Sequence, residues 1–191
     1  MSVGKILVLA GMVLTTVSAV APAAALATWL KHHNAITQDE KLEFTGRAGF
    51  ELAPLDSYDC DVHVSTTLKA GTTTGTVDTY EVTTDTCIGK GGFAKCTLLS
   101  DEALGLPWTM HVESTGGAGR DIAITDVTLK STYGGAGCQV PSSNVHFPKV
   151  TAKPNNQATI GSVALSGGDT ADVVRAYGTL QAVPANTFGL G

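Results

Sequence analysis

Three polar residues in one short segment have the side chains and the spacing of a possible metal site: Asp59, Asp61 and His63. They alternate with Cys60 and Val62, so in a β-strand all three lie on one face. Carboxylate and imidazole groups can coordinate Ca²⁺ or Zn²⁺. Successive side chains on such a face are about 7 Å apart, which is wide for one ion, so an ordinary solvated face is the alternative interpretation. A further carboxylate could come from the next segment, from Asp78, Glu81 or Asp85.

The other polar residues lack the sequence context of a catalytic motif. No G-x-S-x-G segment surrounds a serine, so a serine hydrolase has no nucleophile signature in this chain. Two acids from distant strands could form a glycosidase pair, but an aromatic content of 6% offers little material for a sugar-binding cleft. We therefore favour a protein without catalytic activity and without a cofactor, and we keep a secreted hydrolase as an alternative.

The cysteines indicate a disulfide framework. The chain has four, none in a C-x-x-C pair, and an even number in an exported protein favours two disulfides over a metal site. A hairpin that turns near Thr73 would bring Cys60 beside Cys87, which favours Cys60–Cys87 together with Cys96–Cys138. Simple alternation along the returning strand points Cys87 to the opposite face, so this pairing requires a β-bulge. The alternative is Cys87–Cys96 together with Cys60–Cys138.

Residues 1–27 have the features of a cleaved signal peptide. An apolar run over residues 6–20 follows Lys5, and Pro22 breaks it. The segment closes at Ala27 with the small-x-small pattern that a signal peptidase recognises, so we expect a secreted, extracellular chain that begins at Thr28. The apolar run is short for a membrane anchor, and no later run has spanning length, so we expect no transmembrane span after cleavage.

Composition limits the class of fold and the class of partner. The formal net charge is -5 with 12 Lys and Arg residues, so the chain has no basic surface for nucleic acid. Abundant threonine, 22 glycines and only 15% charged residues suit an antiparallel β domain with many turns. No sustained helical periodicity is present. We expect one all-β domain, an antiparallel β-sandwich or a barrel-like structure, with two disulfides.

Alternating apolar residues place the strands and the domain limits. We divide the chain into a signal peptide over 1–27, an arm over 28–40, the β domain over 41–183 and a tail over 184–191. Within the domain, three prolines make 139–157 a poor central strand, so we expect an edge or a loop there. A phase slip at Asp126 suggests a bulge, and Gly116 to Gly119 suggest a turn. Candidate strands lie near residues 42–52, 58–64, 77–84, 96–98, 108–112, 122–129, 160–165 and 174–183.

Several of these segments together resemble a group of small secreted proteins of actinobacteria with no assigned activity. The resemblance covers roughly residues 41–140. It implies a secreted β domain from an actinobacterial source and no particular chemistry. The matching segments are the strand around Cys60, residues 87–96, Leu106-Pro107-Trp108-Thr109, the strand over 122–129 and Gly-Ala-Gly-Cys138.

These observations favour a secreted, non-catalytic domain that acts in binding or structure at the cell envelope or in the medium. Its partner would be an extracellular or envelope component that the sequence does not identify. The alternative is a secreted protein that binds a small ligand inside the β structure, with Trp108 as the candidate binding residue. Trp108 alternates with Met110 and Val112, so core packing is the simpler interpretation. An enlarged apolar pocket near Trp108 would favour the ligand-binding alternative.

Overall fold

The computed structural model describes residues 28–53, 56–114, 120–140, 142–169 and 174–191. The expected signal peptide and the expected turn at Gly116 to Gly119 lie outside the described residues. Within them the regular structure is antiparallel β, with one short 3₁₀ helix and no α-helix. None of the described helical segments has the length and apolar character needed to cross a membrane.

Within the described residues, twelve strands and the 3₁₀ helix follow one another in sequence. The first half contains β1 (Trp29–Lys31), β2 (Asn34–Ala35), β3 (Glu40–Ala53), β4 (Asp56–Leu68), β5 (Thr74–Gly89), η1 (Gly91–Phe93) and β6 (Thr97–Leu104). The second half contains β7 (Trp108–Ser114), β8 (Arg120–Gly134), β9 (Ser143–Pro154), β10 (Ser162–Gly168), β11 (Arg175–Val183) and β12 (Phe188–Leu190).

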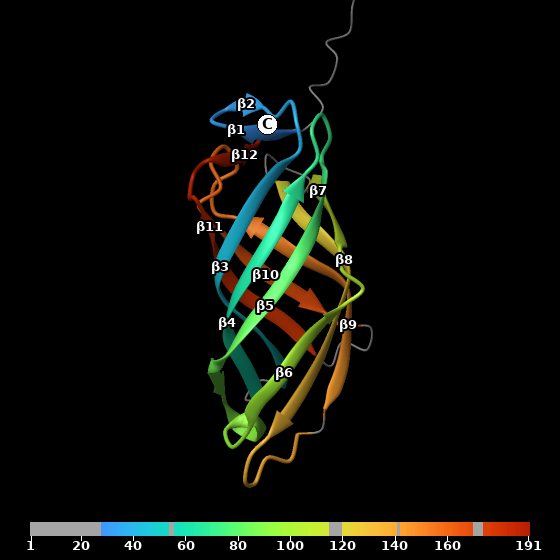
Figure 1. The fold of residues 1–191 in the computed structure, drawn as a ribbon, viewed down its shortest axis with the longest axis vertical. Coiled ribbons are helices and arrows are strands. Elements are labelled where there is room, and N and C mark those ends of the chain that lie inside the picture. The colour runs from blue at the N-terminus through green and yellow to red at the C-terminus, as the bar shows by residue number, and fades with distance from the viewer. Residues whose placement is uncertain (1–27, 54–55, 115–119, 141, 170–173) are drawn as a thin grey trace, which may run out of the picture.

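Eight of these strands close into an antiparallel barrel (Figure 1). The order around the barrel is β8-β7-β5-β4-β3-β11-β10-β9, and pairing of β9 with β8 completes the circle. The all-β prediction is therefore confirmed, in its barrel-like form and with two disulfides. A barrel of about eight strands has an interior that side chains can fill or that can hold one small ligand.

The long strand β8 pairs with β9 along one edge, and along its other edge it pairs with two strands in turn. Its first half pairs with β7, from Met110 with Ile124 to Ser114 with Arg120, and its second half pairs with β6. The other edge of β7 pairs with β5, but only over residues Thr74 to Val77 of β5. Beyond Val77, β5 runs beside β6 without a ladder between them in the described residues (Figure 1). We call this part of the wall the β5–β6 seam.

The alternation of β4 shows how the sequence builds the barrel interior. Tyr58, Cys60 and Val62 are buried, and so are the following alternate residues up to Leu68. The residues between them, which include Asp59 and His63, are more exposed. Period-two alternation therefore gives an apolar inside and a polar outside, as predicted for residues 58–64.

The expected phase slip at Asp126 is present, and it explains how a proline-containing strand joins the wall. Asp126 has a left-handed backbone with φ 58°. Ile122 before it and Val127 after it are both buried, although strict alternation would place them on opposite faces. β9 changes phase at the same level, around Pro148. The β10 ladder stops at Lys149, so Pro148 lies where a missing N–H interrupts neither ladder. The expectation of an edge or loop over 139–157 is thus wrong for β9, which pairs on both sides.

The two chain ends, expected to be an arm and a tail, pair with each other. β1 lies between β12 and β2 in a three-stranded sheet over one end of the barrel, which we call the capped end (Figure 1). Trp29 is fully buried there, and its indole N–H donates to the carbonyl of Thr74 at 2.8 Å. Phe188 and Leu190 are also buried. Burial of these three apolar side chains explains why the short terminal segments are ordered.

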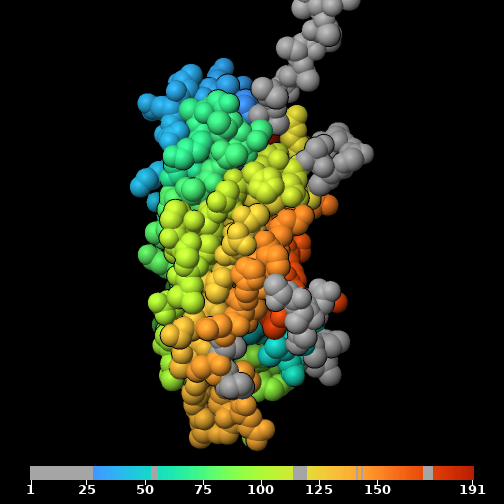
Figure 2. All heavy atoms as spheres, turned by 90° about the vertical axis from the view of Figure 1, so that its right-hand side faces the viewer, coloured from blue at the N-terminus to red at the C-terminus, as the bar shows by residue number. Residues whose placement is uncertain are grey.

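Both disulfides lie toward the opposite end, which we call the disulfide end. The bonds are Cys60–Cys87 and Cys96–Cys138, so the favoured pairing is confirmed. The predicted bulge is also present, because Asp59 pairs with Ile88 while Asp61 pairs with Thr83. At this end the connection between β8 and β9 projects beyond the neighbouring strands (Figure 2).

Candidate ligand cavity

The barrel contains an internal cavity of about 90 Å³. Its wall takes residues from strands around the whole circumference, and most of them are apolar. Trp108 lines the cavity together with Tyr58 and Cys60, and the apolar part of the wall also includes Val64, Val77, Leu129, Phe147 and Leu180. A cavity of this composition favours apolar groups over charged ones, unless a charged group finds a partner on the wall.

Trp108 lines this cavity and also belongs to the core, so the two interpretations of this residue are compatible. Its side chain is 5% exposed, and its indole N–H donates to the carbonyl of Leu104 at 2.8 Å. The ring lies 5.9 Å from the ring of Tyr80, centroid to centroid, at a tilt of 48°. The hydrogen bond and the ring contact hold an aromatic face at the cavity wall.

A β-bulge in β6 turns a carboxylate toward the inside of the barrel. Leu98 pairs with Tyr133 and both are buried, and the register then shifts between Leu98 and Ser100. Without that shift, alternation from Leu98 would point Ser100 inward and Asp101 outward. With it, Asp101 pairs with the inward residue Ser131 and lines the cavity. Bulges commonly redirect a side chain in this way next to functional sites.

The half-buried carboxylate of Asp101 has one neutral partner on the wall. Its Oδ1 accepts a hydrogen bond of 2.5 Å from the hydroxyl of Ser131, which is 1% exposed. Burial raises the pKa of Asp101, and the bond from Ser131 offsets part of that rise. No lysine, arginine or histidine of the described chain lies within ion-pair distance of this carboxylate.

Two tyrosines add to the polar group around Asp101. Burial raises the pKa of both Tyr80 and Tyr133, and the nearby charge of Asp101 raises each further. The Tyr133 hydroxyl is buried without a hydrogen-bond partner of normal geometry among the described residues, although Ser131 lies close enough to lower its pKa. Both phenols therefore stay protonated across the physiological pH range.

Four packed aromatic rings close the barrel at the disulfide end. Phe93 of η1 is 1% exposed and contacts the rings of Phe50, Tyr58 and Tyr133 at centroid distances between 5.4 and 5.8 Å. The Tyr58 hydroxyl accepts a hydrogen bond from the backbone N–H of Leu98 at 2.7 Å. We call these four residues the aromatic cluster. It ties η1 and the start of β6 to the barrel.

The β5–β6 seam forms the part of the cavity wall that no ladder crosses. Tyr80 and Val82 on β5 and Asp101 on β6 line the cavity at this position, and all three are half-buried. A wall without backbone hydrogen bonds between its strands can separate more easily than a laddered one. The carboxylate of Asp101 and the Tyr80 ring therefore lie at a part of the wall where the described strands share no ladder.

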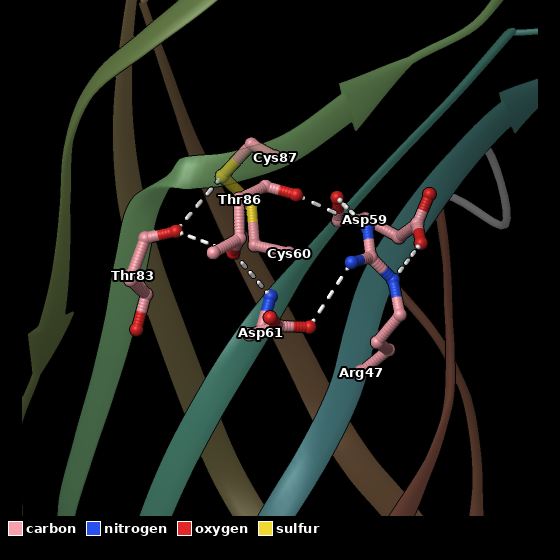
Figure 3. A network of polar contacts seen from close by, with 7 residues as sticks. All are labelled: Arg47, Asp59, Cys60, Asp61, Thr83, Thr86 and Cys87. Carbon is pink, nitrogen blue, oxygen red and sulfur yellow. Dashed lines mark hydrogen bonds and ion pairs between the residues drawn. A yellow bond between two sulfur atoms is a disulfide. The ribbon is translucent and has the colours of Figure 1, made fainter.

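The structure places Asp59 and Asp61 on the outer face of β4, as expected, where Arg47 binds both (Figure 3). The Arg47 Nε donates to Asp59 at 2.7 Å and its Nη1 donates to Asp61 at 3.0 Å. The hydrogen bond that Arg47 donates to Asp59 is the main reason that the pKa of Arg47 is raised. One guanidinium therefore hydrogen-bonds both carboxylates and offsets one of their two negative charges, so it occupies the position that a metal ion would need.

His63 does not join this group. It faces Glu43, with its Nε2 3.5 Å from the carboxylate. Among the described residues, no set of three or more histidine, cysteine, aspartate or glutamate side chains is arranged to hold a metal ion. His111 and His146 also face carboxylates, those of Glu113 and Asp126.

Sequence reasoning missed Asp101 and Tyr80 as cavity residues. A signal was present for Asp101, because Leu98 and Ala103 cannot both face inward under strict alternation. That conflict requires a bulge between Leu98 and Ala103. If the bulge comes before residue 101, Asp101 and Ala103 both face inward. The position of Tyr80 beside Trp108 depends on the closure of the barrel, for which the sequence has no comparable signal.

Comparison with models of protein families, with curated proteins and with solved structures finds no match.

Proposed function

We propose that this protein is a secreted binding protein that holds a small, largely apolar molecule inside its barrel. The observation that carries the proposal is the cavity of about 90 Å³ beside Trp108, with the Asp101 carboxylate on its wall. A well-packed core leaves few voids larger than a water molecule, and it excludes carboxylates without a cationic partner. A protein that retains both features in one place has a use for them.

The size of the cavity limits the ligand. An apolar cavity of about 150 Å³ is known to bind benzene, so the cavity of this barrel is the smaller of the two. A cavity of 90 Å³ suits a compact molecule of a few heavy atoms or the end of a longer chain. A longer ligand would leave the barrel where the wall lacks a ladder, at the β5–β6 seam.

Secretion is part of the proposal. The apolar run and the Ala27 cleavage pattern support export, and both disulfides suit an oxidising compartment. Action on a partner at the cell envelope stays a prediction from the sequence. A hydrolase would gain support from a serine–histidine hydrogen bond, and the bonds of the described residues include none.

The direct test is a titration of the protein with benzene and with xenon, followed by amide chemical shifts. We expect saturable shifts at residues that line the cavity, such as Trp108, Leu129 and Leu180. Ala176→Leu, which adds bulk at the β11 part of the wall, should abolish them, and Val82→Phe should do the same from β5. Thr179→Leu on the outer face of β11 is the matched control and should bind normally.

The proposal fails if neither probe shifts the cavity residues of the folded protein, or if the filled variants bind as well as the control. A second measurement addresses the natural ligand. Native mass spectrometry of the protein from its natural source should detect a bound molecule that unfolding releases. The same experiment reports the mass of a chain that begins at Thr28 with two disulfides.

A further inference from the structure

Asp101 and its neighbour on β6 point to opposite sides of the barrel wall. The neighbouring acidic residue on the same strand, Glu102, points outward and lies 3.9 Å from Lys130 across the ladder to β8. Asp101 is turned inward by the bulge and is fixed by the 2.5 Å bond from Ser131. Two adjacent carboxylates thus have opposite environments, one beside a lysine in solvent and one inside an apolar wall.

The inner carboxylate lacks the compensation that the outer ones have. Asp59 and Asp61 share Arg47, whereas Asp101 has only the neutral hydroxyl of Ser131 among the described residues. A carboxylate removed from water without a cation loses solvation free energy that one neutral hydrogen bond recovers only in part. A positively charged group brought into the cavity would recover much of the rest.

The wall around Asp101 suits a cation better than an anion. The rings of Tyr80 and Trp108 lie 5.9 Å apart at the cavity wall, and an aromatic face attracts a positive charge. An anion would meet the negative charge of Asp101 and an otherwise apolar surface. Apart from Ser131 and the tyrosine hydroxyls, the remaining wall is aliphatic or aromatic, so it suits a hydrocarbon body.

We propose that the ligand is a small organic amine whose ammonium group pairs with the Asp101 carboxylate and whose apolar body occupies the cavity toward Trp108. The ammonium group lies at the β5–β6 seam, between Asp101 on one strand and the ring of Tyr80 on the other. This inference rests on the proposed function, because it names the chemical class of the ligand for the same cavity.

The test compares three probes of nearly equal size: butylammonium, 1-butanol and butyrate. Affinities are measured by amide chemical-shift titration at pH 7. For the unmodified protein we expect butylammonium to bind about tenfold more tightly than 1-butanol, because a charge-assisted bond replaces a neutral one. Butyrate should show no saturable binding.

Asp101→Asn keeps the shape of the side chain and removes its charge. In this variant the preference for butylammonium over 1-butanol should vanish, while binding of 1-butanol is retained. Glu102→Gln, one residue away on the outer face, is the matched control and should keep the preference. The comparison of probes on the unmodified protein remains decisive if Asp101→Asn does not fold.

The outcomes separate the two proposals. Equal binding of butylammonium and 1-butanol to the unmodified protein, or an unchanged preference in Asp101→Asn, overturns the amine inference and leaves the cavity as a binding site for neutral ligands. Absence of binding by all three probes and by xenon overturns both the amine inference and the proposed function.

Discussion

The disulfide end and the middle of the barrel are built from the same strands but differ in how their interiors are packed. At the disulfide end the aromatic cluster packs the interior, one disulfide joins β4 to β5, and the other joins the segment after η1 to the β8–β9 connection. In the middle the wall surrounds a cavity, contains the carboxylate of Asp101 and lacks a ladder at the β5–β6 seam. Stability supplied at one end allows the other region to keep features that reduce stability.

The comparison predicts that truncation of a side chain at the disulfide end is costly. Phe93→Ala removes the ring that contacts the other three members of the aromatic cluster and leaves a hole in a packed region. We expect a loss of about 3–5 kcal/mol in the free energy of unfolding, measured by denaturant titration. Ile88→Ala, at a 52% exposed position of the same end, should change it by less than about 0.5 kcal/mol. Similar effects of the two variants would mean that the aromatic cluster is not packed as described.

The disulfides give the next largest effect. Cys60→Ala with Cys87→Ala opens a loop of 27 residues, and Cys96→Ala with Cys138→Ala opens one of 42 residues. Chain-entropy estimates give a loss of about 3–4 kcal/mol for each pair, and strong reductant should produce the combined effect in the unmodified protein. An unchanged melting temperature under reductant would show that these bonds do not support the disulfide end.

In the middle of the barrel, the substitution Asp101→Asn should stabilise the folded protein. Burial raises the pKa of Asp101 above the ordinary value of 3.8, so the folded state binds this proton more tightly than the unfolded state. Stability is therefore lost as pH rises from the ordinary pKa through the raised one, and the loss persists at neutral pH. The titratable groups that face Asp101 are Tyr80 from β5 and Tyr133 from β8, whose raised pKa values keep them neutral in this range.

Asp101→Asn removes the loss of stability that ionisation of Asp101 causes. At pH 7 its melting temperature should exceed that of the unmodified protein by about 2–4 °C, which corresponds to roughly 1 kcal/mol for a chain of this size. The two curves should converge below about pH 3.8, where Asp101 is protonated in both states. Glu102→Gln should show no such crossover. A lower melting temperature for Asp101→Asn at pH 7 would mean that the carboxylate is compensated inside the barrel and would weaken the contrast between the two regions.

The sequence predicted the all-β class, the disulfide pairing and most strands, because each depends on local alternation or on one hairpin. Cys60–Cys87 followed from the turn between two adjacent strands, and the bulge it needed is present. The role of β9 was not predictable in the same way, because Pro148 is compatible with a wall strand only where the β10 ladder ends. The cavity depends on closure around the whole barrel. For that reason the sequence drew attention to Asp59 and Asp61 on the outer face of β4. The structure points instead to Asp101 of β6, which faces the barrel interior.

The smallest expected effect concerns those outer acidic residues. If Arg47 compensates Asp59 and Asp61, a chelator such as EDTA should leave the melting temperature unchanged, since no ion is needed there. Arg47→Ala should lower stability by no more than about 1 kcal/mol, because the pairs are partly exposed to solvent. In Arg47→Ala, however, the two carboxylates lose their cation, so added Ca²⁺ should raise the melting temperature of this variant alone. A chelator effect on the unmodified protein would instead identify a metal site on the outer face of β4, and the inner carboxylate of Asp101 would then no longer be the better candidate for binding a cation.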